Sequence, residues 1–207
     1  MAESNSTLAR VRTGYSYPKV AQYSVDATHA VTYSGLVDLA LGVEINITAE
    51  STGRKIFRAN NGPQISAPRR MTGGTITSTC SHPVPSVLEF IEGTPTPGAD
   101  GVVVDDDTVV VPYLGYGYIV RYMLADGSQV WRPFLITKVQ FLSKAESAKT
   151  EEEDIDFQSE VIEFSIFRDD SVNHTWRKRG KFWETEQEAL TELNTVLFGI
   201  AAQGGST

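Results

Sequence analysis

The sequence predicts a mainly β protein of the α+β class, with two short helices beside its strands. Two strand-like runs, Gly115–Leu124 and Val130–Leu142, flank the turn residues Ala125–Ser128, and Asp-Gly between such runs predicts a hairpin. Apolar and polar residues alternate with a period of two in other segments, as in strands with one solvated face. Helical periodicity is confined to two short segments.

Three further segments show strand patterns. Leu41–Ala49 has apolar residues at every second position, and residues 75–80 place threonines on one face. Ile155–Asp170 changes phase at Val161–Ile162, which predicts a β-bulge. A further hairpin is expected over residues 173–182. The glycines of Gly115-Tyr116-Gly117 indicate a close approach of other atoms to the backbone, because no helix follows them as in a phosphate-binding loop.

Two amphipathic helices are expected. The first covers Val84–Ile91, where apolar residues recur at helical spacing between Pro83 and Gly93. The second begins at Thr185, and Glu188 three residues later completes a capping box. Its apolar stripe comprises Ala189, Leu190, Leu193, Val196 and Leu197.

The segment Glu50–Gly74 is expected to be a long inter-strand loop, and loops of this length are commonly functional. It carries five basic residues and a pair of turn-forming amides: Arg54, Lys55, Arg58, Arg69, Arg70, Asn60 and Asn61.

Length and composition indicate one globular domain. The 207 residues divide into an N-terminal arm (1–13), a folded domain (14–198) and a flexible C-terminal tail (199–207). No apolar run is long enough to span a bilayer, and the N-terminus does not resemble a secretory signal. The single cysteine, Cys80, fits a reducing cytoplasm, and a net charge of −8 argues against a general nucleic-acid binder.

The sequence does not indicate an enzyme, a metal site or a cofactor. His29, His82 and His174 lie in unrelated segments without a second ligand at metal-site spacing. The run Asp105–Asp107 lacks the glycine and distal glutamate of a calcium loop. Surface, capping and solvation roles are therefore expected for these residues.

The order of these segments resembles the major tail proteins of long-tailed, non-contractile (siphovirus-type) bacteriophages. The resemblance runs from about residue 14 to 199 and lies in GYSYPKVAQY, GVEINITAES, RKIFRANNG, the GYGYIVRY…WRPFLITKVQF hairpin, AKTEEEDIDFQSEVIEFSIFRD, and Trp176 with the TEQEAL helix. It implies a β-barrel or sandwich with a flanking C-terminal helix. Subunits of this family form hexameric rings that stack around a tape measure protein into a tail tube, which delivers the genome.

The resemblance also implies partners and a location. The chain would assemble with itself in the host cytoplasm, become part of the virion tail, and meet the tape measure, tail terminator and distal tail proteins. DNA would pass through without specific binding, and no membrane contact is expected. The loop Glu50–Gly74 is assigned to the contact between rings, with acidic partners at Asp105, Asp106, Asp107, Glu151, Glu152 and Glu153; a solvated basic loop without a partner is the alternative.

The channel of such a tube should be polar or acidic, because a basic lining would bind the DNA phosphates and stall the passage of DNA. The solvated strand faces supply the candidate lining: Glu44, Asn46, Thr48, Thr75, Thr77, Thr79, Asp154, Asp156, Gln158 and Glu160.

A β-sandwich binding or decoration module, which would bind a capsid or a carbohydrate, is the alternative function. Tyr116, Tyr118, Tyr122 and Trp131 could stack on a sugar, but even spacing places the three tyrosines on one strand face, as expected for packing.

Overall fold

The computed structural model describes residues 10–53, 56–59, 62–66, 69–94, 109–145 and 159–200, without the side chains of residues 58, 59 and 63–66. Most described residues belong to strands, which confirms the mainly β class. The strands are β1 (Val11–Val25), β2 (Val31–Asp38), β3 (Gly42–Ser51), β4 (Ile56–Ala59), β5 (Gly62–Ser66), β6 (Met71–Cys80), β7 (Tyr113–Met123), β8 (Gln129–Ala145), β9 (Glu160–Phe167) and β10 (Arg177–Arg179). The helices are α1 (Pro85–Glu92) and α2 (Glu186–Glu192), and a π-helical turn (Leu193–Leu197) continues α2.

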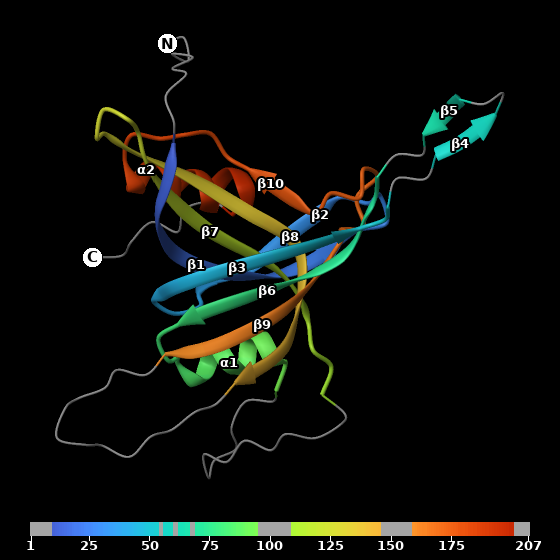
Figure 1. The fold of residues 1–207 in the computed structure, drawn as a ribbon. Coiled ribbons are helices and arrows are strands. Elements are labelled where there is room, and N and C mark those ends of the chain that lie inside the picture. The colour runs from blue at the N-terminus through green and yellow to red at the C-terminus, as the bar shows by residue number, and fades with distance from the viewer. Residues whose placement is uncertain are drawn as a thin grey trace.

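Eight strands form one antiparallel sheet, in the order β2-β1-β7-β8-β9-β6-β3, with β10 paired to β8. The sheet is open, because within the described chain β2 pairs only with β1 and β3 pairs only with β6. It is nevertheless strongly curled, so that β3 approaches β1 (Figure 1). The ring of Tyr15 lies so close to Gly42 that a Cβ atom there would be 2.4 Å from it.

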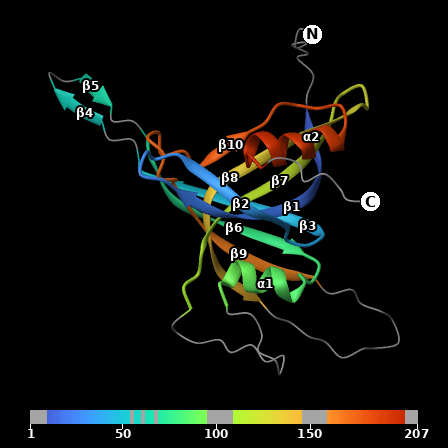
Figure 2. The same cartoon turned by 180° about the vertical axis from the view of Figure 1, so that it is seen from behind.

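The inner face of the curled sheet holds the main core. Leu39, Ile76, Tyr116 and Phe164 are fully or almost fully buried there, and α1 lies against one end of this interior (Figures 1 and 2). The expected helix at 84–91 is thus confirmed within one residue, with Gly93 in the left-handed conformation after its end (φ 78°). Its buried residue Ile91 joins the same cluster.

A buried hydroxyl network ties β1, β6 and β7 together inside this core. The Tyr116 hydroxyl donates to Ser78 Oγ at 2.9 Å and lies 2.7 Å from the Tyr15 hydroxyl. Tyr116, Tyr118 and Tyr122 are all buried on the inner face, as their even spacing predicts. These aromatic side chains therefore pack in the core and are not a sugar-binding platform.

The outer face of β1, β7 and β8 is covered by α2 and the π-helical turn (Figure 2). Gly115 and Gly117 make this packing possible, because Phe198 lies directly against the backbone of Gly117, and Tyr33 and then Phe198 lie against that of Gly115. A Cβ atom at Gly117 would be 2.4 Å from the Phe198 ring. The predicted close approach at the two glycines is confirmed; at Gly117 it comes from the C-terminal segment, and at Gly115 from Tyr33 of β2 together with that segment.

The hairpin β7–β8 and the capping box of α2 follow the sequence prediction. Asp126 accepts hydrogen bonds from the backbone and hydroxyl of Ser128 in the turn, where Gly127 has φ 82°. At the helix start, the Glu188 backbone N–H donates to Thr185 Oγ1. The apolar stripe of the helix differs at its end, because the Phe198 N–H bonds to the carbonyl of Leu193. The wider π turn leaves Val196 66% exposed and buries Phe198, which is 3% exposed.

Several strand details differ from prediction. The bulge expected at Val161–Ile162 is wrong, since β9 pairs with β6 in continuous register and the irregularity lies on β8, between Phe141 and Ser143. The expected hairpin over 173–182 is also wrong, because β10 pairs with β8 instead. β1 begins at Val11, so residues 11–13 of the predicted arm belong to the sheet.

We predict that Gly117→Ala lowers the free energy of unfolding by about 1–3 kcal/mol, because the added methyl group displaces Phe198 and overpacks the outer face. Chemical denaturation measures the change. Gly53→Ala is the matched control, since no heavy atom lies within 4 Å of its Cβ position. If the two variants were equally stable, the close contact between Gly117 and Phe198 would not limit the packing, and the prediction would be wrong.

Alkaline pH should also destabilise the fold. Burial raises the pKa of Tyr15 and of Tyr118 to about 12, from an ordinary value of 10.0. The unfolded chain loses these protons near pH 10, whereas the folded chain keeps them, so stability is fully present below about pH 10 and falls as the pH rises towards 12. Urea midpoints at about pH 8 and about pH 11 test this loss, which Tyr118→Phe should reduce. A midpoint that does not change with pH would contradict the prediction.

Candidate assembly surfaces

One half of the outer sheet face is polar, and no other described element covers it. Glu44, Asn46 and Thr48 of β3 lie directly opposite Thr79, Thr77 and Thr75 of β6. All six side chains are exposed or half-buried, and they form one continuous surface. The structure therefore brings together the six predicted lining residues that belong to β3 and β6.

The same polar face continues onto β9 and β8. Glu163 pairs with Thr77, and Ser165 pairs with Thr75. The Ser143 hydroxyl of β8 donates to Glu163 at 3.2 Å. No lysine or arginine occurs in the described strands β3, β6 and β9, so the charge of their outer face comes from carboxylates such as Glu44 and Glu163.

Glu160 does not belong to this face. It pairs with Cys80, whose side chain is buried in the inner core, and its carboxylate contacts His82 and lies 4.0 Å from Lys144. The phase of β9 follows the buried residues Ile162, Phe164 and Ile166, which places Glu163 and Ser165 outward. The alternation of Glu163 and Ser165 with these apolar residues is the sequence pattern that indicates their outward position. The other candidates, Asp154, Asp156 and Gln158, lie outside the described residues.

The second surface is a projecting hairpin. The backbone of Thr52 and Arg70 pairs beyond the end of β3 and β6, and β4 and β5 then form a separate two-stranded sheet that extends away from the body (Figure 1). The predicted long loop thus contains two strands. Ile56 and Phe57 of β4 are exposed, the latter by 63%.

Few of the predicted contact residues of this hairpin are described. Arg69 and Arg70 are exposed at its base, where Arg69 Nε bonds to the Ser51 hydroxyl. Arg58 lies in β4, but its side chain is not described. The remaining candidates lie outside the described residues: Arg54, Lys55, Asn60, Asn61, Asp105, Asp106, Asp107, Glu151, Glu152 and Glu153.

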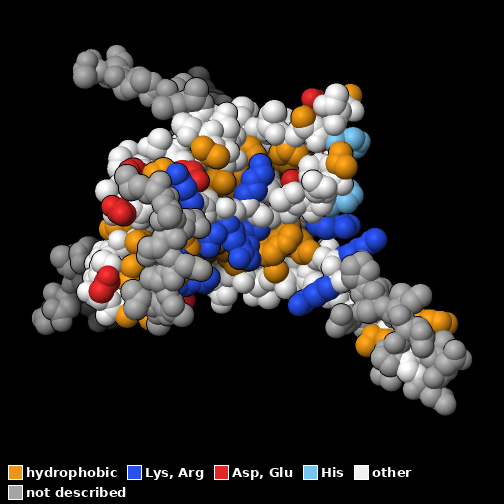
Figure 3. Space-filling view, turned by 90° about the horizontal axis from the view of Figure 1, so that it is seen from above, with side chains coloured by type: hydrophobic (Ala, Val, Ile, Leu, Met, Phe, Trp, Pro, Cys, Tyr) orange, Lys and Arg blue, Asp and Glu red, His pale blue; other side chains and the backbone are white. Residues whose placement is uncertain are grey.

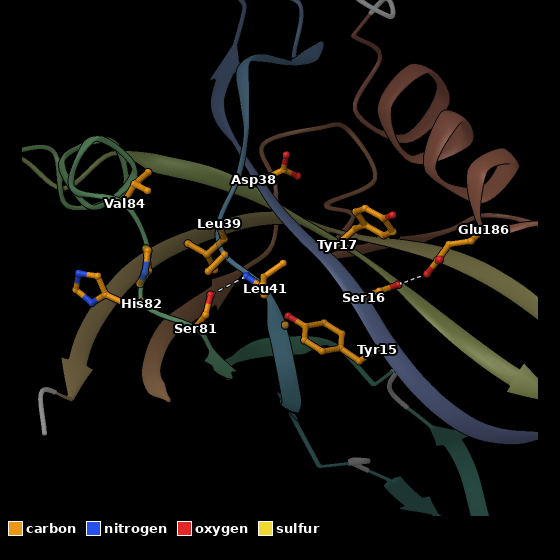
Figure 4. Close-up of a pocket in the computed structure, with 13 residues that line it drawn as sticks. Tyr15, Ser16, Tyr17, Asp38, Leu39, Leu41, Ser81, His82, Val84 and Glu186 are labelled. Carbon is orange, nitrogen blue, oxygen red and sulfur yellow. Dashed lines mark hydrogen bonds between the residues drawn. The ribbon is translucent and has the colours of Figure 1, made fainter. Parts of the chain in front are cut away.

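A groove of about 660 Å³ forms a third surface, where the β2–β3 connection meets β1 and the start of α1. Figure 4 shows Tyr17, Leu41 and Val84 around it, and all three side chains are exposed. Its acidic side chains are already engaged. Asp38 pairs with Lys19 at 2.5 Å, and Glu186 accepts a hydrogen bond from Ser16 at 2.6 Å. The groove therefore offers mainly apolar contact.

The histidines bond within the chain. His29 Nδ1 lies 2.9 Å from the Asp170 carbonyl, and His174 Nδ1 lies 3.2 Å from that of Asp169. Among the described residues, no three His, Cys, Asp or Glu side chains gather as a metal ion would require. The described helices include none with the length and apolar character needed to cross a bilayer.

The chain matches no protein-family model, and a search of curated proteins gives no match either. The surfaces themselves are thus the grounds from which a function can be inferred.

Proposed function

We propose that this protein is a structural subunit that polymerises into stacked rings and forms a tube, as the major tail proteins of non-contractile bacteriophages do. One observation carries the proposal: among the described residues, the sheet has a polar face that no other element covers, and its two outermost strands each have one unpaired edge. The protein would be part of the virion tail, and six copies per ring is the number that the resemblance implies.

Sheet edges are the first physical argument. The outer edges of β2 and β3 present backbone N–H and C=O groups without a strand partner in the described part of the chain. Such edges pair readily with other chains. Pairing such an edge with a strand of the next copy satisfies these groups, and a heterologous contact of this kind closes into a ring when its rotation allows.

The polar face is the second argument. In a ring joined through its sheets, the outer faces of β3, β6 and β9 would line the channel with hydroxyl, amide and carboxylate groups. Glu44 and Glu163 would repel DNA phosphates, so DNA could pass without being held.

The β4–β5 hairpin supplies a contact along the tube axis. Exposed Ile56 and Phe57 would pack on the next ring. Arg69 and Arg70, at the foot of the hairpin, would contact acidic residues there. A second heterologous contact that does not close yields a filament. Tape measure, tail terminator and distal tail proteins would occupy the interior and the two ends of this filament.

Electron microscopy and sedimentation of the concentrated protein test this proposal, with rings or tubes as the expected result. Phe57→Asp should leave the monomer's stability within about 0.5 kcal/mol, because the side chain is exposed, but should abolish stacking. Val196→Asp changes an equally exposed apolar residue, on the C-terminal helix, and should still assemble. Single subunits under all concentrations, salts and nucleating conditions would refute the tube.

A further inference from the structure

Four arginines gather on the inner face of the sheet, at the end remote from α1. Arg12 pairs with Tyr122 across β1 and β7, and Arg177 pairs with Ile136 across β10 and β8. Arg179 and Arg132 lie on the same side, the first opposite Phe134 and the second opposite Val120. Figure 3 looks onto this end and shows Lys and Arg side chains clustered in its centre.

None of these four arginines has an ion pair with a carboxylate among the described residues. Aromatic rings and backbone hold two of them, Arg177 and Arg132, instead. The Arg177 guanidinium lies 4.5 Å from the ring centre of Trp176, and that of Arg132 lies 4.7 Å from Phe182. Arg132 Nε also donates to the Gly180 carbonyl at 2.7 Å. The guanidinium groups of Arg132 and Arg177 are therefore held in place without being neutralised.

The concentration of like charge is unfavourable for the isolated chain. Burial lowers the pKa of Arg177, and the neighbouring charges of Arg179 and Arg12 lower it further. A guanidinium does not lose its proton at physiological pH, so deprotonation cannot relieve this electrostatic repulsion. A bound anion would relieve it, and it would form charge-assisted hydrogen bonds with the fork of each guanidinium.

Two of these arginines, Arg12 and Arg177, line a groove along the outer edge of β3. A cavity of about 420 Å³ separates Arg12, Arg177 and Tyr118 from residues 43–47 of β3. A second cavity, of about 430 Å³, continues beside residues 47–51, with Arg69 and Arg177 in its lining. Eight residue steps of a strand give this arginine groove a length of roughly 27 Å. It is long enough for an extended peptide rather than a single small anion.

We propose that the arginine groove binds an extended, carboxylate-rich segment of a second copy of this chain, residues 151–156. This inference rests on the proposed self-assembly and names one contact within it. The segment Glu-Glu-Glu-Asp-Ile-Asp has five carboxylates in six residues. In an extended conformation, Asp154 and Asp156 project to the same side about 7 Å apart, and could each meet a guanidinium.

The β3 edge supplies the remaining interactions. Its outward N–H and C=O groups have no strand partner in the described chain, so they can pair with the backbone of a docked strand. Nucleic acid is a poorer occupant, since it has no peptide backbone to pair with the edge of β3. In this arrangement Asp154 and Asp156 occupy a neighbouring subunit's groove and not the channel wall.

Fluorescence anisotropy with a labelled peptide of residues 149–158, added to the dilute unassembled protein, tests the groove. The double variant Arg12→Gln, Arg177→Gln should weaken binding at least about tenfold, and added salt should weaken binding to the unmodified protein. Arg12→Gln alone changes an exposed side chain, and it tests the groove if the double variant does not fold. Lys178→Gln is the matched control, because Lys178 lies on the same strand opposite Leu135, on the outer face.

Three results would overturn the inference: equal binding of a peptide in which the five acids are amides, undiminished binding by the arginine variants, or displacement of the peptide by a single-stranded oligonucleotide that binds more tightly. Microscopy of the assemblies distinguishes a failure of this inference from a failure of the proposed function. Tubes without peptide binding refute only the groove, whereas specific peptide binding without tubes or rings refutes only the tube.

Discussion

The open edges of the curled sheet are the constraint on which the other features depend. β3 approaches β1 but pairs only with β6, and β2 pairs only with β1, within the described chain. A strand edge with unpaired backbone groups is an energetic liability in a soluble protein, and the usual remedies are closure, covering or pairing with another chain. The gap between β3 and β1 is neither closed by strand pairing nor covered by a described helix. Pairing between copies is the remedy that the proposed ring supplies.

The interior explains why the sheet can stay open without collapsing. Tyr116 joins Tyr15 and Ser78 through buried hydroxyl contacts, so the three strands that carry these residues are fixed relative to one another. At one end α1 fills the core, and on the outer face Phe198 packs against the glycines of β7. Both faces of β7 are buried over most of its length, so the two cores of the protein meet on this strand.

Charge is distributed over the fold in a way that matches the proposed assembly. The outer face of β3, β6 and β9 carries carboxylates and small polar groups. The inner face, at the end remote from α1, carries the four arginines Arg12, Arg132, Arg177 and Arg179. In the proposed assembly, the acidic face would line the channel, and the arginines would bind the acidic segment of another copy. Both assignments remain proposals about copies in contact, since the lone chain leaves each surface unpartnered among the described residues.

Local patterns in the sequence determined the β7–β8 hairpin, the polar face of β3 and β6, α1 and the start of α2, because turn chemistry, alternation and capping act over a few residues. Such patterns did not predict β1, β2 or the two strands of the projecting hairpin. Only the tertiary structure decided which way Glu160 points, which residue ends the C-terminal stripe and where the arginines meet. Arg12 and Arg177 are 165 positions apart in the chain. Their proximity follows from strand register, and register is set by the packing of the whole sheet.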